Sequence, residues 1–108
     1  MNHYIVDLSS NNHDGPIDHK AAMDDLRARG GGAQPGAVVK ASEGPSYGNP
    51  DYQIDIDGTL AADGAVATYH FLHSSASAES QLANLKNNLA RVQNPGKCWA
   101  DVEEGGLD

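Results

Sequence analysis

Four short apolar runs, separated by stretches with helical periodicity, constrain the fold of this chain more than any other feature. The runs are residues 4–8, 37–41, 66–72 and 98–102, and turn-forming residues bound each of them. Each run is almost continuously apolar and does not alternate, which is typical of strands covered on both faces of a parallel sheet. The pattern therefore predicts four parallel strands.

Between these runs lie three stretches with the apolar spacing of amphipathic helices. The first follows Asp18 and ends at glycines 30–32, the second begins at Asn49 and Pro50 and ends at Gly64, and the third ends before Pro95. Strands and helices thus alternate along the chain, which predicts an α/β architecture. We expect these apolar helix faces to pack on the sheet: Ala22, Met23 and Leu26; Tyr52, Ile56 and Leu60; and Leu82, Leu85, Leu89 and Val92.

Polar residues stand at the exit of every predicted strand. Because the carboxyl ends of parallel strands meet at one rim, where the loops are free to vary above a rigid core, we expect these side chains to gather there. They are Asp7 after the first run, Lys40 and Glu43 after the second, His70 after the third, and Asp101 and Glu103 after the fourth.

The last strand carries two carboxylates two residues apart, Asp101 and Glu103. On an extended strand such residues point to the same face, about 7 Å apart at the backbone. A glycosidase needs two acids in this relation, one protonated to donate to the leaving oxygen and one ionised. The same spacing also occurs on solvated strand ends, so the pair indicates a catalytic site only together with the polar residues at the ends of the other strands.

Several sequence blocks resemble glycoside hydrolase family 25, the N-acetylmuramidase lysozymes of bacteria, fungi and phages. They occur in the family's order from Asp7 to Glu103. Ser42 stands where threonine is more usual. The blocks are residues 7–12 (DLSSNN), 15–18 (GPID), 38–44 (VVKASEG) with Tyr47, 49–52 (NPDY), 62–64 (ADG), 68–71 (TYHF), Gln81, and 101–103 (DVE).

The resemblance implies a fold and a reaction. The fold is an irregular (β/α) barrel of TIM-like type, of which this chain supplies about the first four strands and three helices. The reaction is retaining hydrolysis of the β-1,4 bond between N-acetylmuramic acid and N-acetylglucosamine in peptidoglycan, without a metal or organic cofactor. The implied catalytic residues are Glu103, Asp101 and Asp7, and the residues implied to lie near the sugar are Glu43, Tyr69 and His70. We add Lys40 to the expected substrate-binding residues because it stands at the end of the second run.

The implied mechanism has Glu103 as general acid and then general base. Repulsion from Asp101 and Asp7 would raise the pKa of Glu103 enough for it to hold a proton. Asp101 either attacks the anomeric carbon or orients the substrate's own N-acetyl group for that attack. The family favours the second route, and the residues alone leave both open.

Complete (β/α) barrels typically need ~250 residues, so we expect residues 1–108 to be the amino-terminal part of a single muramidase domain. The record is then truncated, or the product of a split gene, or a degenerate remnant. A C-terminal segment or a second chain would complete the barrel. Peptidoglycan glycan strands are the expected partner.

The composition limits which other classes of partner are expected. The formal net charge is −8, with 15 acidic against 7 basic side chains. This balance disfavours nucleic acid, which is bound through clusters of Lys and Arg. The chain has neither a signal-like start nor an apolar run long enough to cross a bilayer. It therefore fits either a phage enzyme made in the host cytoplasm and acting on the wall, or a secreted enzyme whose signal is missing from the record.

The remaining candidates for chemistry are weak. The single cysteine, Cys98, excludes an intrachain disulfide and is expected to be a buried, inert thiol in a core strand. His70 and His73 would face opposite ways and make a poor metal pair. Asp55 and Asp57 lie within the second predicted helix and lack the later ligands of a calcium loop.

Two alternatives of other classes stay open. A non-catalytic sugar-binding remnant would bind muropeptides without releasing reducing ends. A small, open, doubly wound α/β domain would serve as an interaction module with no affinity for peptidoglycan.

Overall fold

The computed structural model describes residues 5–8 and 17–101 and contains the predicted alternation of strands and helices. In chain order the described elements are β1 (Ile5–Leu8), α1 (His19–Arg29), β2 (Gly36–Glu43), β3 (Tyr47–Gly48), α2 (Tyr52–Ala61), β4 (Ala65–Phe71), α3 (Ala78–Leu89) and β5 (Lys97–Asp101). The four predicted strands correspond to β1, β2, β4 and β5, which all pair in parallel. The predicted α/β class is therefore confirmed.

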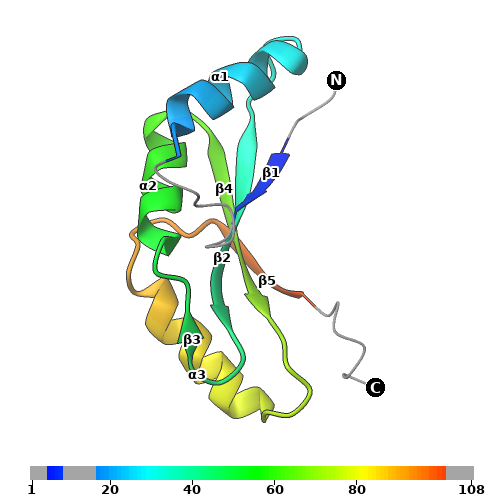
Figure 1. Ribbon diagram of the computed structural model, residues 1–108, viewed down its shortest axis with the longest axis vertical. Coiled ribbons are helices and arrows are strands. Elements are labelled where there is room, and N and C mark those ends of the chain that lie inside the picture. Colours follow the sequence, from blue (N-terminus) through cyan, green and yellow to red (C-terminus); the bar gives the residue numbers. More distant parts are fainter. Residues whose placement is uncertain (1–4, 9–16, 102–108) are drawn as a thin grey trace.

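The four parallel strands are arranged in the order β1-β2-β4-β5, so each new strand is added on the same side of the previous one. Parallel crossovers are right-handed almost without exception, and a sheet that grows in one direction therefore collects its helices on one face. Figure 1 shows α1, α2 and α3 together on one side of the strands. This progressive winding is that of a (β/α) barrel. A doubly wound sheet reverses its strand order and carries helices on both faces, so the described residues do not form one.

The hydrophobic core lies between the helices and the sheet. The buried residues of this core cluster come from β1, β2 and α2, and they are Leu8, Ala37, Val39, Ala41, Tyr52 and Ile56. Tyr52 of α2 also places its hydroxyl 2.7 Å from the Thr68 hydroxyl of β4, and Thr68 donates to the Pro95 carbonyl at 2.8 Å. Burying a tyrosine is favourable only when its hydroxyl has such a partner, so this contact fixes α2 on the sheet.

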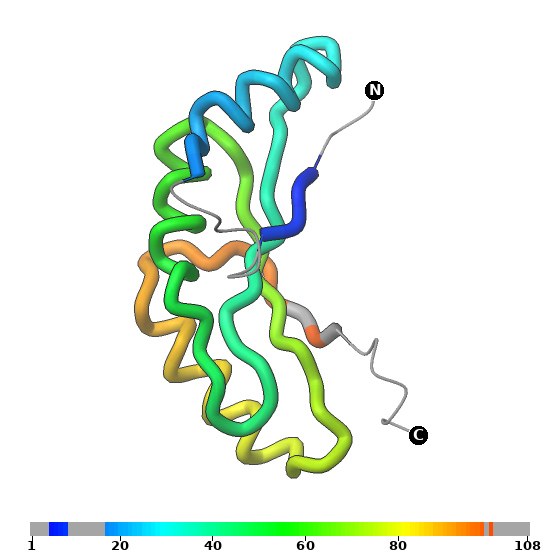
Figure 2. Tube along the Cα trace, in the orientation of Figure 1, coloured from blue at the N-terminus to red at the C-terminus, as the bar shows by residue number. Residues whose placement is uncertain are grey.

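The expectation that every strand is covered on both faces is wrong for three of the four. Of these four strands, only β2 is buried or half-buried along its whole length; it pairs with β1, β3 and β4, and α2 and α3 pack against it. β1 and β5 are the outer strands of the described sheet, and β4 begins with an exposed residue. Figure 2 traces the chain from β1 in blue to β5 in orange.

Cys98 is a second correction. It lies on β5 and is exposed, because within the described chain β5 pairs with β4 alone. Desolvation by its neighbours still raises the pKa of the Cys98 thiol above its ordinary value. A raised pKa keeps the thiol protonated near neutral pH, so Cys98 is exposed without being an activated nucleophile.

The predicted helices exist with shifted boundaries. α1 begins after Asp18, whose carboxylate accepts from the Ala21 amide at 3.0 Å, and ends at Gly30. α2 begins later than expected, at Tyr52 with Asp51 as N-cap, since the Asn49 side chain accepts from the Asp51 amide and closes a separate turn. The two-residue strand β3, antiparallel to β2, has no counterpart in the prediction.

The expected core face of α3 is partly wrong. Leu85 and Val92 pack beside the core as predicted, whereas Leu82 is 52% exposed. The buried residues of α3 are instead Gln81, Asn84 and Asn88. The helix lies over the end of the sheet where strands turn into loops, and the backbone groups of those loops need polar partners.

A buried pair joins α1 to α2. The His19 ring nitrogen Nε2 lies 2.8 Å from Oδ1 of Asp55, whose side chain is fully buried. Gly58 permits this approach, because a Cβ there would lie 2.5 Å from the His19 ring. Asp55 is thus a structural group inside a helix pair, while Asp57 on the same helix is exposed.

Candidate active site

A β-bulge in β2 organises the polar end of the sheet. Lys40 pairs with Tyr69, and Ser42 pairs with His70, so Ala41 is an extra residue between two successive pairs. In a regular strand Lys40 and Glu43 would point to opposite faces. The bulge shifts the alternation by one residue, and the two side chains then form an ion pair on the same face.

Most of the described residues expected in the site lie on the sheet face that carries no helix. Leu8 is packed in the core, so its neighbour Asp7 points the other way and is exposed. Tyr69 lies between Thr68 and His70, which bond to α2 and α3, and so it also points away from the helices. Asp7, Tyr69 and the Lys40–Glu43 pair therefore share one face.

Glu43 lies between Lys40 and His73. Its carboxylate accepts from the Lys40 ammonium, and its other oxygen lies 2.7 Å from Nε2 of His73. Partial burial raises the pKa of Glu43, but the hydrogen bonds and charges of Lys40 and His73 outweigh this and hold that pKa below its ordinary value. Glu43 is therefore ionised at neutral pH and serves as a hydrogen-bond acceptor, not as a proton donor.

Two aromatic rings enclose the Lys40 ammonium. Its nitrogen is 5.6 Å from the centre of the Tyr47 ring and 5.1 Å from that of Phe71. Such cation–π contacts are attractive and hold the long side chain in one place. The group of Lys40, Glu43, Tyr47, Phe71 and His73 is called the rim cluster below.

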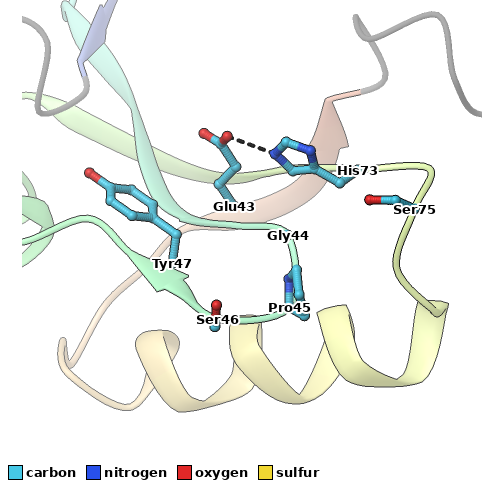
Figure 3. A pocket seen from close by; sticks show the side chains of 7 residues that line it. All are labelled: Glu43, Gly44, Pro45, Ser46, Tyr47, His73 and Ser75. Atoms are coloured by element: carbon cyan, nitrogen blue, oxygen red, sulfur yellow. Dashed lines mark hydrogen bonds and ion pairs between the residues drawn. The ribbon is translucent and has the colours of Figure 1, made fainter.

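Beside the rim cluster lies an open cleft of about 230 Å³. Figure 3 shows one wall formed by the turn from Gly44 to Tyr47 and the opposite wall by His73 and Ser75, with Glu43 between them. The lining presents an ionised carboxylate, two serine hydroxyls and a tyrosine ring. Hydroxyl-rich, neutral ligands such as sugars are bound by this combination of acceptors and an aromatic surface.

His70 is in β4 as predicted but lies on the face covered by helices. It is 2% exposed, and its two ring nitrogens contact the Ser42 hydroxyl at 2.7 Å and Oε1 of Gln81 at 3.0 Å. Both polar atoms of the ring therefore have protein partners. In the described structure His70 supports the rim from beneath, and a direct contact of His70 with sugar stays a prediction.

Two of the three expected catalytic residues are at described backbone positions, and Glu103 lies outside the described residues. Asp7 shares a row of the sheet with Val38, Ala67 and Lys97, whereas Asp101 ends β5 in the row of Glu43 and Phe71. The rows of Asp7 and Asp101 are thus four residues apart along β4, from 67 to 71. In this sheet alone Asp7 and Asp101 are not neighbours.

That offset has the size of a barrel's stagger. An eight-stranded barrel with a shear of eight shifts by about one residue per strand, since its strands are tilted against the axis. Asp7 and Asp101 are separated by three strand intervals, β1 to β2, β2 to β4 and β4 to β5. Curving the sheet into a barrel is what would bring them to one height.

Sequence reasoning missed several residues of this region as site residues. His73 was considered only as half of a metal pair, yet it holds Glu43. Tyr47 and Gln81 were noted without a role. Tyr47 lies next to Glu43 because β3 pairs with β2, and a strand of two residues is too short to be predicted from sequence. Among the residues that the structure describes, no group of three or more His, Cys, Asp or Glu side chains could hold a metal ion.

The chain resembles known proteins in sequence and in fold. The family model described as "Glycosyl hydrolases family 25" matches residues 6–107. A family 25 glycosyl hydrolase from Bacillus anthracis superposes with a TM-score of 0.69 at 20% identity, covering 90% of this chain and 41% of that one. A muramidase from Trichobolus zukalii superposes with a TM-score of 0.57 at 23% identity, covering 76% of this chain and 36% of that one.

This chain therefore spans less than half the length of either solved structure. No curated protein matches the sequence. Among the described helices, none has the length and apolar character needed to cross a membrane.

Proposed function

The chain belongs to glycosyl hydrolase family 25, and from this premise we propose that it is the amino-terminal part of a muramidase domain. The complete domain cleaves the β-1,4 bond between N-acetylmuramic acid and N-acetylglucosamine in peptidoglycan. The observation that carries the proposal is the family match over residues 6–107, a span that includes Asp7 and Glu103. The acidic and aromatic side chains on the helix-free face of the sheet support it.

In the proposed mechanism Glu103 donates a proton to the glycosidic oxygen and then activates water. Asp7 and Asp101 raise the pKa of Glu103 by like-charge repulsion and stabilise positive charge at the anomeric carbon. We assign to Asp101 the orientation of the substrate's N-acetyl group, with direct attack as the competing route. Both routes retain the anomeric configuration.

The described side chains have binding roles in this proposal. Glu43, held ionised by Lys40 and His73, accepts hydrogen bonds from sugar hydroxyls. Tyr69 and Lys40 line the helix-free face, and His70 supports that face from the helix side. The enzyme acts at the cell wall, reached either from the cytoplasm of a phage-infected cell or by secretion.

The test is a hydrolysis assay on purified peptidoglycan with two proteins. One is the 108-residue chain, and the other is a fusion that continues from its last residue into the remaining part of the Bacillus anthracis hydrolase. We expect the fusion to release reducing ends that mass spectrometry identifies as N-acetylmuramic acid, because only it completes the rim.

A folded fusion that binds muropeptides and releases no reducing ends would support the sugar-binding alternative instead. Circular dichroism of the fusion establishes that it is folded. A fusion in which Glu103 is replaced by Gln serves as the matched inactive control.

A further inference from the structure

The buried side of α3 is polar where an amphipathic helix would be apolar. Gln81, Asn84 and Asn88 are buried and lie three and four residues apart, so they share one side of the helix. Burying an amide side chain is unfavourable unless its donors and acceptor are satisfied. The partners of these amides therefore explain why the helix carries them.

Gln81 uses all of its hydrogen-bonding capacity. Its Nε2 donates to the carbonyls of His73 at 2.8 Å and Ala76 at 3.2 Å. Its Oε1 accepts from the His73 amide at 3.0 Å and contacts the ring of His70. The Gln81 side chain, which is 3% exposed, thus bonds to both the amide and the carbonyl of His73.

Asn84 bonds to the backbone of the turn between β2 and β3. Its Nδ2 donates at 3.0 Å to the carbonyls of Gly44 and Tyr47, the two ends of the turn between β2 and β3. Its Oδ1 accepts from Nδ2 of Asn88 at 3.0 Å. Asn84 therefore holds the turn closed and is itself oriented by the next turn of α3.

These two amides anchor both walls of the cleft. Figure 3 shows the turn from Gly44 to Tyr47 and the segment from His73 to Ser75 facing each other above α3. Glu43 lies between the walls and is bonded to His73. The distance between the walls, and hence the direction of the Glu43 carboxylate, depends on two side chains one turn apart on the same helix.

We propose that Gln81 and Asn84 are positioning residues that hold the two cleft walls at the spacing needed to bind a glycan. This inference rests on the proposed function for the identity of the ligand. Neither residue contacts sugar, because both are buried beneath the loops that they hold. They act through His73 and Glu43 on one wall, and through the turn of residues 44–47 on the other.

The contacts of Gln81 predict which ring nitrogen of His70 carries the proton. Because the amide group of Gln81 is oriented by two carbonyls, its Oε1 must face the His70 ring, and His70 must donate from Nε2. In the neutral ring Nδ1 is then the acceptor, and the Ser42 hydroxyl donates to it. The tautomer of His70 therefore reports directly on the Gln81 contact.

The first measurement uses the chain itself, labelled with ¹⁵N, in long-range ¹H–¹⁵N correlation spectra. We expect His70 in the form protonated at Nε2, and the backbone amide of His73 among the slowly exchanging ones. A neutral His70 protonated at Nδ1 would overturn the proposal without any variant having to fold.

The second measurement compares isosteric substitutions. Gln81→Glu and Asn84→Asp remove the donors without changing shape. In Gln81→Glu a carboxylate oxygen would face the carbonyls of His73 and Ala76 and be repelled by them, so we expect the side chain to leave this position and amide exchange at His73 to accelerate by roughly tenfold or more. Asn84→Asp should change the amide shifts of residues 44–47. The controls are Gln53→Glu on α2 and Asn87→Asp on α3, which add the same charge at exposed positions. Equal effects in the controls would contradict a positioning role.

The third measurement is kinetic and uses the fusion described above. We expect both substitutions to raise KM by about tenfold with little change in kcat, because they loosen the binding cleft and leave Glu103 in place. A fall in kcat with KM unchanged would contradict the proposal. If the fusion is inactive while the spectra behave as expected, the proposed function fails and the positioning role survives.

Discussion

At the scale of single residues, the rim cluster shows how local charge sets the role of a carboxylate. The Glu43 carboxylate contacts Lys40 and His73. Lys40 and His73 lower the pKa of Glu43, whereas a general acid needs neighbours that raise it. Glu43 is therefore suited to accepting hydrogen bonds and not to donating a proton.

Glu43 should make the stability of the chain depend on pH. Its pKa in the folded chain lies below its ordinary value of 4.5, so its contribution is present above about pH 4.5 and is lost as the pH falls through the folded-state pKa. Urea denaturation of the wild type and of Glu43→Gln between pH 3 and 7 measures this. We expect the two stability curves to converge at low pH, and parallel curves would contradict the assignment.

Gly96, which precedes β5, should be intolerant of any side chain. Its φ is +70°, and a Cβ there would lie 1.9 Å from the Val66 carbonyl oxygen of β4. Gly31 is a matched control, with a φ of +65° and nothing within 4 Å.

We expect Gly31→Ala to cost about 1 kcal/mol of unfolding free energy and Gly96→Ala about 2–4 kcal/mol, since the second adds displacement of a strand to the backbone strain. Thermal denaturation of both variants provides the comparison. Equal losses would show that the close approach to Val66 is relieved at no cost.

At the scale of elements, the helices are attached to the sheet by different means. α2 packs on β2 and β4 through Tyr52 and Ile56, in the way that its apolar pattern predicts. α1 is joined to α2 by the buried His19–Asp55 pair. α3 carries an apolar edge and a polar side, because part of it covers the core and part of it covers loops.

The His19–Asp55 pair should be required for the docking of α1. Asp55→Ala leaves the His19 ring without this partner, and we expect a loss of about 1–3 kcal/mol in unfolding free energy. Asp57→Ala, on the exposed side of the same helix, makes the same gain in helix propensity and should change stability by less than about 0.5 kcal/mol. Chemical denaturation measures both, and a similar change in the two variants would refute a structural role for the pair.

At the scale of the whole molecule, the winding of the sheet explains where the chemistry is found. The three described helices lie on one side of the strands (Figure 1). Asp7, Lys40, Glu43 and Tyr69 are on the opposite face of the sheet, which no described helix covers. In a (β/α) barrel the corresponding face lines the interior, and its carboxyl rim holds the active site. The chain covers 41% and 36% of the two solved structures that it resembles.

Substitutions of Glu103 and Asp101 should have different effects on the activity of the fusion. We expect Glu103→Gln to lower kcat by about 10²–10⁴-fold with little change in glycan binding, because an amide keeps the shape but donates no proton of comparable acidity. Asp101→Asn should also lower kcat, by weakening the stabilisation of positive charge at the anomeric carbon. Hydrolysis kinetics and binding calorimetry distinguish the two effects. Unchanged turnover in Glu103→Gln would remove it as the acid.

Treatment with a fluorosugar decides between the two roles of Asp101. Attack by the substrate's N-acetyl group leaves no trappable covalent bond to the protein. Mass spectrometry should then find no adduct, and an adduct on Asp101 would assign it as the nucleophile.

The alternation of strands and helices and the parallel sheet could be predicted from the sequence, because they depend on local patterns of apolar and turn residues. The family could be recognised from the sequence blocks between Asp7 and Glu103. The same patterns placed Asp7, Lys40, Glu43 and His70 at strand ends. The face that each side chain occupies could not be predicted from these patterns, because the bulge at Ala41 reverses the alternation in β2. It also placed His70 beneath the rim and His73 on Glu43, and gave the buried side of α3 to amides. Those positions depend on which loops the helix covers, and no repeat within the sequence encodes that contact.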